Sequence, residues 1–175
     1  MRKLKNSELE RISVENFKSS KKTPIIVVLD NIRSALNVGS AFRTSDAFRI
    51  EKVYLCGITA TPPNKEIRKS ALGSTNSVDW EYIEETEDII LYLKKKNYLI
   101  CSVEQVENST LLHQFSHTEK PIVVVFGNEV NGVQQSVIDL SDYCIEIPQI
   151  GTKHSLNISV SIGIVLWDLY NRIIQ

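Results

Sequence analysis

Two short runs of branched apolar residues restrict the fold of this chain more than any other feature. Ile25-Ile-Val-Val-Leu29 and Ile122-Val-Val-Val-Phe126 are continuously apolar and lack the alternation of a half-exposed strand. Such runs are typical of central parallel strands that are covered on both faces. We therefore predict an α/β protein with a mostly parallel sheet and helices on both faces.

Apolar periodicity, capping residues and turn signals predict strands and helices in alternation along the whole chain. The predicted strands are 25–29, 52–56, 78–83, 98–103, 121–126 and 143–147. The predicted helices are 8–19, 38–48, 85–96, 133–140 and 156–173, with a short helical segment that ends near Gly73. The first helix rests on Ser7 and Glu10, which have the spacing of a capping box. The length suits one main domain, 24–175, after a short N-terminal helical extension, 1–23.

Composition narrows the class of protein and its location. Hydrophobic residues make up 42% of the chain, and no segment approaches the roughly 20 apolar residues of a membrane span. The first residues are charged and do not form an apolar signal core, so we expect a soluble, cytoplasmic protein without a membrane partner. The cysteines Cys56, Cys101 and Cys144 lie in or beside apolar runs and are expected to be reduced core residues.

The charge balance limits how this protein could bind nucleic acid. A net charge of -1 argues against a protein that coats nucleic acid through bulk positive charge, so any such partner must be held by local patches. Residues 1–22 carry seven basic and three acidic side chains, a local charge of +4. This segment is a candidate basic patch, and a solvated amphipathic helix is the alternative.

The first candidate site directly follows the apolar run at 25–29. Asn37 is a good N-cap residue, and Gly39 and Arg43 are four residues apart, hence on one face of a helix. Helical side chains lean toward the N-terminus, so the guanidinium of Arg43 is expected to pass over Gly39 and join the free amides of the helix start. This arrangement would bind an anion such as a phosphate. A surface arginine beside a tight helix start is the alternative.

Two further polar segments follow later strands. Gly127-Asn-Glu-Val-Asn-Gly132 comes directly after the run at 122–126, and its glycines permit a tight turn that carries Glu129. Farther on, Ser155 or Asn157 can cap the last helix. A solvated glutamate and an ordinary helix cap are the structural alternatives. Because the carboxyl ends of parallel strands open into one crevice, we expect all three segments to form a single site.

The absence of certain motifs argues against several familiar ligand sites. The first strand is not followed by Gly-x-Gly-x-x-Gly, and no Gly-Lys-Ser/Thr phosphate loop occurs, which disfavours a dinucleotide domain and a P-loop NTPase. The His, Cys, Asp and Glu residues show no metal-ligand spacing, so no metal is expected.

Taken together and in this order, the three segments resemble the signature motifs of the SpoU/TrmH family of RNA ribose 2'-O-methyltransferases, within the SPOUT superfamily. Asn37 to Arg43 resembles the first motif and Val125 to Gly132 the second. Ile147 to Ser159 resembles the third, and Lys65 to Gly73 fits an intermediate landmark. The likeness covers residues 24 to 174 and is specific because three motifs occur in order.

The resemblance implies more than the residue patterns do. The C-terminal part is expected to form a deep trefoil knot, an exception to the general absence of knots. The resemblance also implies a homodimer with the active site at the subunit interface, and S-adenosyl-L-methionine as the donor for methylation of a ribose 2'-hydroxyl in tRNA or rRNA. Carried over residue by residue, the expected cofactor contacts are Val103, Gly127, Asn128, Gly132, Ile147 and Leu156.

The catalytic and supporting positions that the resemblance implies are Arg43, Asn37, Glu129, Ser155 and Asn157. A general-base role for Arg43 is one option, but arginine is effectively always protonated in proteins. We therefore expect Arg43 to grip a neighbouring phosphate and orient the ribose hydroxyl, while the other four fix Arg43, the ribose and the cofactor loop. RNA would be recognised by a restricted basic surface, 1–22 with Lys65, Arg68 and Lys69.

Two other functions compete with methyl transfer. An RNA-binding or assembly module could retain the knot fold without methyl transfer, although the five matching polar residues argue against it. A metabolic nucleotide-binding α/β protein would explain the alternation of strands and helices but leaves the three motifs unexplained.

Overall fold

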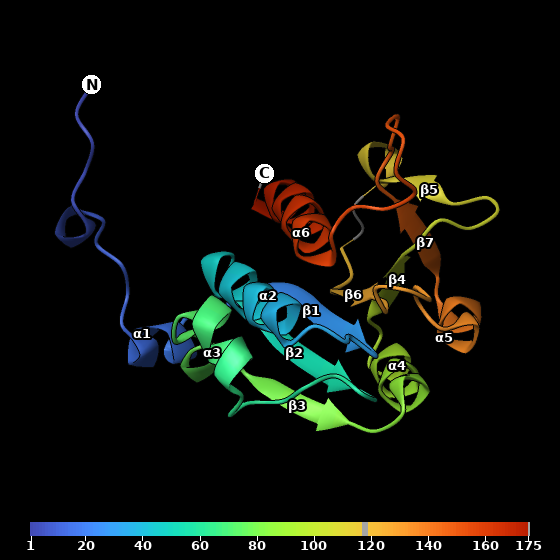
Figure 1. The fold of residues 1–175 in the computed structure, drawn as a ribbon, viewed down its shortest axis with the longest axis horizontal. Helices are drawn as coiled ribbons and strands as arrows, with labels where there is room; N and C mark the ends of the chain where they lie inside the picture. The colour runs from blue at the N-terminus through green and yellow to red at the C-terminus, as the bar shows by residue number, and fades with distance from the viewer. Residues whose placement is uncertain (117–118, 175) are drawn as a thin grey trace.

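The computed structural model describes residues 1–116 and 119–174, and over these residues the chain forms a seven-stranded sheet (Figure 1). Its order is β3-β2-β1-β6-β4-β7-β5, and the paired strands are parallel. The strands are β1 (Thr23–Asp30), β2 (Ile50–Cys56), β3 (Trp80–Ile83), β4 (Leu99–Val103), β5 (Thr110–Leu111), β6 (Ile122–Phe126) and β7 (Tyr143–Glu146). The predicted parallel α/β architecture is confirmed.

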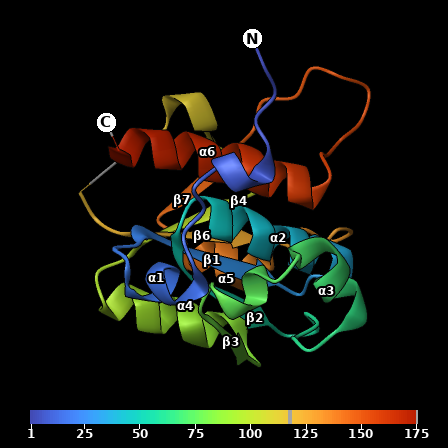
Figure 2. The ribbon, with the colours of Figure 1, turned by 90° about the vertical axis from the view of Figure 1, so that its left-hand side faces the viewer.

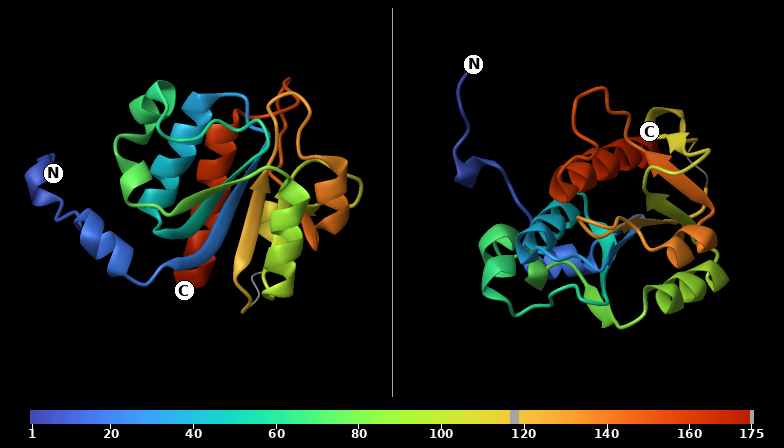
Figure 3. Two further views of the ribbon diagram at one scale, coloured as in Figure 1. Left: turned by 90° about the horizontal axis from the view of Figure 1, so that it is seen from below. Right: turned by 45° about the vertical axis from the view of Figure 1, so that its right-hand side comes forward.

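Helices cover both faces of this sheet (Figures 1 and 3). The α-helices are α1 (Val14–Ser19), α2 (Ala35–Ala47), α3 (Lys65–Ala71), α4 (Thr86–Lys95), α5 (Gln135–Leu140) and α6 (Ile158–Ile174). Short 3₁₀ helices are η1 (Asn6–Glu8), η2 (Ser74–Asn76) and η3 (Leu112–Gln114). Helices α2, α3 and α6 pack on one face, and α4 and α5 pack on the other.

The continuous apolar runs are explained by burial on both faces. In β1, Val27 belongs to the core beneath α2, α3 and α6, whereas its neighbour Val28 belongs to the core beneath α4 and α5. Both side chains are fully buried. A strand in this position has no solvent face, so every residue of the run is apolar.

Four strands end at the same level of the sheet. Leu29 of β1 is in register with Phe126 of β6, which in turn pairs with Val103 of β4, and Val103 pairs with Ile145 of β7. The loops that follow these four strands therefore gather at one edge, where parallel sheets bind their ligands.

The N-terminal prediction was wrong. Instead of one helix over 8–19, the segment forms η1 and then α1, separated by Glu10 at φ 46, a left-handed conformation that interrupts a helix (Figure 2). The helix cap is Ser13, whose Oγ accepts from the Asn16 N–H at 3.2 Å, and not Ser7. Within η1, the carboxylate of Glu8 accepts two hydrogen bonds from the guanidinium of Arg2.

Burial of the thiols matches the expected role of the cysteines. Cys56 and Cys101 are buried, Cys144 is partly buried, and all three are free. Burial raises the pKa of the Cys56 thiol to about 12 and also raises that of Cys101, so neither is a ready nucleophile.

None of the helices in the described part of the chain has the length and apolar character that a membrane crossing requires.

Candidate cofactor cavity and its polar rim

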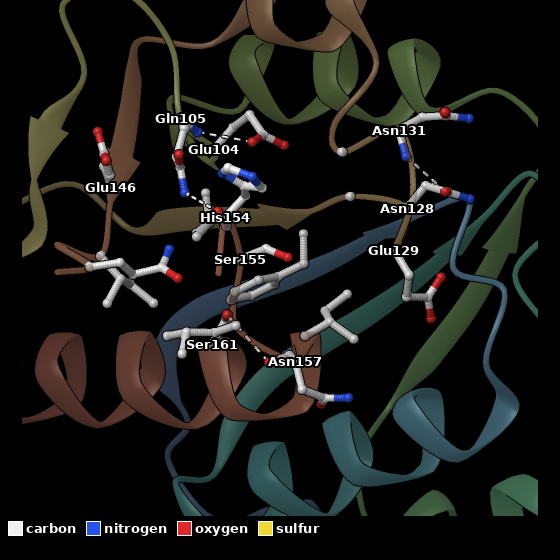
Figure 4. A pocket seen from close by; sticks show the side chains of 18 of the residues that line it. Glu104, Gln105, Asn128, Glu129, Asn131, Glu146, His154, Ser155, Asn157 and Ser161 are labelled. Carbon is white, nitrogen blue, oxygen red and sulfur yellow. Dashed lines mark hydrogen bonds between the residues drawn. The ribbon is translucent and has the colours of Figure 1, made fainter. Parts of the chain in front are cut away.

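A cavity of about 590 Å³ opens at the carboxyl edge of the sheet (Figure 4). Three loops form it: the loop after β4, the loop between β6 and α5, and the loop between β7 and α6. Its volume is within the range of ordinary small-molecule sites. All six residues predicted to contact a cofactor line this cavity, namely Val103, Gly127, Asn128, Gly132, Ile147 and Leu156.

The loop after β6 is a closed turn that requires glycine at both ends. Asn128 and Gly132 exchange two backbone hydrogen bonds of 2.9 Å, which brings the loop back on itself. A methyl group on Gly127 would collide with the backbone of Gly132 and Val133, and Gly132 has φ +70. The side chain of Asn128 stiffens the turn, since its Oδ1 accepts from the N–H groups of Val130 and Asn131.

Glu129 projects from this turn onto the segment before α2. Its carboxylate accepts hydrogen bonds from the backbone N–H groups of Arg33 at 2.9 Å and Ser34 at 3.0 Å, and from Nδ2 of Asn37 at 2.9 Å. Partial burial would raise the pKa of Glu129, but the hydrogen bonds from Arg33, Asn37 and Ser34 outweigh it and lower the pKa. Glu129 is therefore a carboxylate that joins the first and second motifs.

A connection between the end of β1 and the loop after β6 was not predicted. Asp30, at the end of β1, is fully buried, and its Oδ2 accepts from the N–H of Gln134 at 2.9 Å. Its Oδ1 accepts from the hydroxyl of Thr86 at 2.6 Å. The carbonyl of Asn31 accepts from the Asn128 side chain at 2.7 Å. Both ends of the loop after β6 are thus bound to the end of β1. An aspartate directly after a continuously apolar run is the sequence signal that could have identified Asp30, because a charged side chain in such a place needs partners.

Glu104 and Gln105 were also missed, although they directly follow the predicted Val103. Glu104 accepts from the N–H of Val133 at 3.0 Å, and Nε2 of Gln105 donates to the carbonyl of His154 at 2.8 Å. The loop after β4 therefore contacts both other loops of the cavity, as Figure 4 shows for Gln105 and His154. No sequence motif marks this pair, because the contacts depend on loops that are distant in sequence.

The third motif lies on the cavity wall and starts the last helix. Ser155 and Asn157 both line the cavity. The Oδ1 of Asn157 accepts from the N–H of Ser159 at 2.9 Å and from its hydroxyl at 2.6 Å, so Asn157 caps α6 as predicted. The helix begins at Ile158 and not at 156.

The predicted position of Arg43 over the helix start was wrong. Helix α2 begins three residues earlier than expected, with Ser34 as its N-cap and Asn37 inside the first turn. Gly39 is packed against α3, where an added methyl group would collide with Ser70 Oγ and the carbonyl of Ile67. Gly39 therefore permits close helix packing and does not make room for Arg43. The N–H groups of Arg33 and Ser34 are bound by Glu129, which leaves them unavailable to a phosphate.

Arg43 is exposed and borders a second cavity of about 950 Å³. Arg43 is six positions after Asn37, and at about 100° per residue along the helix the two side chains point about 120° apart. The second cavity lies between α2, the segment 71–77 and the N-terminal segment, which contributes Arg11. Within one chain, Glu129, Ser155 and Asn157 therefore line the first cavity, and Asn37 is joined to it through its hydrogen bond to Glu129. Arg43 lies elsewhere, on the second cavity.

Comparison with known proteins finds a family and relatives that match most of the chain. The family described as "SpoU rRNA Methylase family" matches residues 24–167. A tRNA (guanosine(18)-2'-O)-methyltransferase of Aquifex aeolicus is 30% identical over 147 residues, which cover 82% of this chain and 67% of that protein.

Two solved structures share the fold. The A. aeolicus TrmH/SpoU tRNA modifying enzyme superposes with a TM-score of 0.80 at 28% identity, covering 91% of this chain and 79% of the other. An AdoMet-bound rRNA methyltransferase from Sinorhizobium meliloti gives a TM-score of 0.82 at 25% identity, covering 89% of this chain and 59% of the other. The chain also spans only 63% of a relative from Staphylococcus haemolyticus. The match of one family over residues 24–167, most of the chain, places this protein in the SpoU rRNA methylase family.

Proposed function

We propose that this protein is an S-adenosyl-L-methionine-dependent methyltransferase that methylates a ribose 2'-hydroxyl in tRNA or rRNA. The observation that carries the proposal is the convergence of all six expected cofactor residues on one cavity beside the linked Asn37 and Glu129. Family membership supports the same reaction class.

The cavity is chemically suited to this cofactor. Val103, Phe126, Ile145, Ile147 and Leu156 supply apolar surface that can cover a purine ring. Asn128, Ser155 and Asn157 add side-chain hydrogen-bonding groups to the same wall. Glycine at 127 and 132 allows the backbone of the loop after β6 to approach a ligand closely.

When bound, S-adenosylmethionine supplies an electrophilic methyl carbon attached to a positively charged sulfur. A ribose 2'-hydroxyl is a weak nucleophile at neutral pH, so the protein must orient it and assist loss of its proton. We assign orientation of the ribose to Asn37 and Ser155, and rigidity of the rim to Glu129 and Asn157. Arg43 is assigned to a phosphate next to the reacting ribose, and the general-base role remains the less favoured alternative because arginine stays protonated.

The position of Arg43 supports a homodimer. One chain alone leaves Arg43 on the second cavity, so a partner subunit is needed to bring an Arg43 to the site, as the family resemblance implies. Exposed apolar side chains on α6, Val160, Ile164 and Trp167, offer a surface for such a partner. Leu36 at the start of α2 is also exposed.

We also propose the trefoil knot that the resemblance implies. After β7, the chain passes the cavity through residues 147–157 and enters α6 on the face opposite α5. The bond from Gln105 to His154 ties this passage to the loop after β4. These contacts support a threaded C-terminal segment that would shape the cofactor cavity.

The proposal is tested by incubating the protein with methyl-labelled S-adenosylmethionine and total RNA from a strain that lacks it, and then mapping the labelled ribose. Label in a 2'-O-methyl nucleotide of tRNA or rRNA is the expected result. Cofactor binding without transfer to any RNA would favour the RNA-binding or assembly module instead.

A further inference from the structure

The described residues that line the cofactor cavity carry more negative than positive charge. Its described lining residues include three carboxylates, Glu104, Glu129 and Glu146, and none is lysine or arginine. The lining residue that could become cationic is His154. A wall of one sign attracts ligands of the opposite charge, and low-dielectric walls strengthen the effect.

The three carboxylates differ in the hydrogen bonds that they accept within the chain. Glu129 is directed to the segment before α2. Glu146 accepts from the hydroxyl of Ser109 at 2.6 Å. Glu104 accepts from two backbone N–H groups in the loops that form the cavity, from Gln105 at 2.9 Å and Val133 at 3.0 Å.

The environment of Glu104 fixes its position without neutralising its charge. Among the ion pairs of residues 1–116 and 119–174, none includes Glu104. An ionised carboxylate can accept about four hydrogen bonds, so two N–H donors leave acceptor capacity unused. A methyl group on Gly132 would collide with Glu104 Oε2, which shows how closely the carboxylate is seated against the loop after β6.

We propose that Glu104 makes this cavity discriminate the methyl donor from the spent cofactor by charge. This inference rests on the proposed function. Transfer of the methyl group forms a carbon–oxygen bond at the ribose and breaks the carbon–sulfur bond, whose electron pair stays on sulfur. The sulfonium becomes a neutral thioether, and the hydroxyl proton leaves to solvent. Glu104 therefore attracts the donor more than the product and favours product release.

The test compares the dissociation constants of S-adenosylmethionine and S-adenosylhomocysteine by calorimetry on the wild-type protein and Glu104→Gln. The amide keeps the side chain's shape and removes its charge. We expect the ratio of product Kd to donor Kd to fall about three- to tenfold in the variant, as for a partly screened charge on the wall of the same cavity. Glu104→Asp keeps the charge, so it should retain the ratio even if both ligands bind more weakly.

A merely structural role for Glu104 predicts a different result. Disturbed loops would weaken both ligands equally and leave the ratio unchanged in Glu104→Gln, which overturns the inference. Glu107→Gln is the matched control, because Glu107 is exposed and does not line the cavity. If the ratio falls equally in that control, the discrimination comes from the net charge of the protein and not from Glu104. If the wild-type protein binds neither compound, the proposed function itself fails.

Discussion

Asn37 donates a hydrogen bond of 2.9 Å to Glu129, 92 residues away in the chain. The first belongs to α2 and the second to the turn after β6. Their contact makes the first and second motifs one structural unit at the rim of the cavity.

Asn37 and Glu129 should be energetically coupled. In a double-mutant cycle of Asn37→Ala and Glu129→Ala, we expect a coupling of about 0.5–1 kcal/mol in the free energy of unfolding, since the bond is largely exposed. Denaturant unfolding of the four proteins measures it. Additive effects of the two substitutions would contradict a direct interaction.

The stabilising contribution of Glu129 should depend on pH. Its pKa is lowered below the ordinary 4.5, so its contribution is complete above that value and is lost as the pH falls through the lowered pKa. The stability difference between the wild-type protein and Glu129→Gln should therefore be constant from pH 7 to about pH 5 and shrink below the ordinary pKa of about 4.5. Urea unfolding at a series of pH values tests this window. A difference that persists unchanged at pH 3 would argue against the carboxylate as its source.

Gly39→Ala should destabilise the protein through helix packing. The added methyl group would collide with Ser70 Oγ and with the backbone of α3, so we expect a loss of roughly 1–3 kcal/mol. Gly151→Ala is the control, because its added methyl group would meet no atom of this chain within 4 Å and its φ is not positive. Alanine there should be neutral or stabilising by up to about 1 kcal/mol. Thermal unfolding compares them, and equal losses would contradict the packing argument.

Arg43→Lys should separate cofactor binding from turnover. Arg43 does not line the cofactor cavity, so the Kd for S-adenosylmethionine should stay unchanged. Lysine lacks the planar fork that binds a phosphate through two hydrogen bonds, so the rate of methyl transfer should fall about 10- to 100-fold. Calorimetry and a single-turnover assay measure the two quantities. Near-normal turnover would exclude both the phosphate-binding and the general-base role.

RNA binding should depend on the predicted basic surface. Lys21 and Lys65 are exposed, whereas Lys69 is paired with Glu66 at 2.8 Å and is a poorer candidate. Lys21→Gln with Lys65→Gln should weaken RNA binding and reduce the slope of log K against log salt by about 0.7–1 per lysine. Lys95→Gln with Lys120→Gln carries the same charge change elsewhere. A slope that both pairs reduce equally would indicate nonspecific attraction.

The sequence by itself determined the layered architecture and the residues that gather at the cavity. Runs such as Ile25 to Leu29 have no polar position, which only a strand buried on both faces can tolerate. Parallel strands then bring the segments after β1, β6 and β7 to one edge, because their carboxyl ends must lie together. The six cofactor positions were named from the resemblance to the SpoU/TrmH family, and all six line the cavity at this edge.

Only the tertiary structure decided what the polar side chains contact. Gly39 was expected beneath Arg43 but packs on α3, and the amides expected to bind a phosphate are bound by Glu129. Asp30 and Glu104 carry no motif, yet they bind the loop after β6 to its neighbours. These contacts join residues that are distant along the chain. They depend on how each helix is rotated about its axis and on how closely the loops approach one another, which local propensity and residue spacing do not encode.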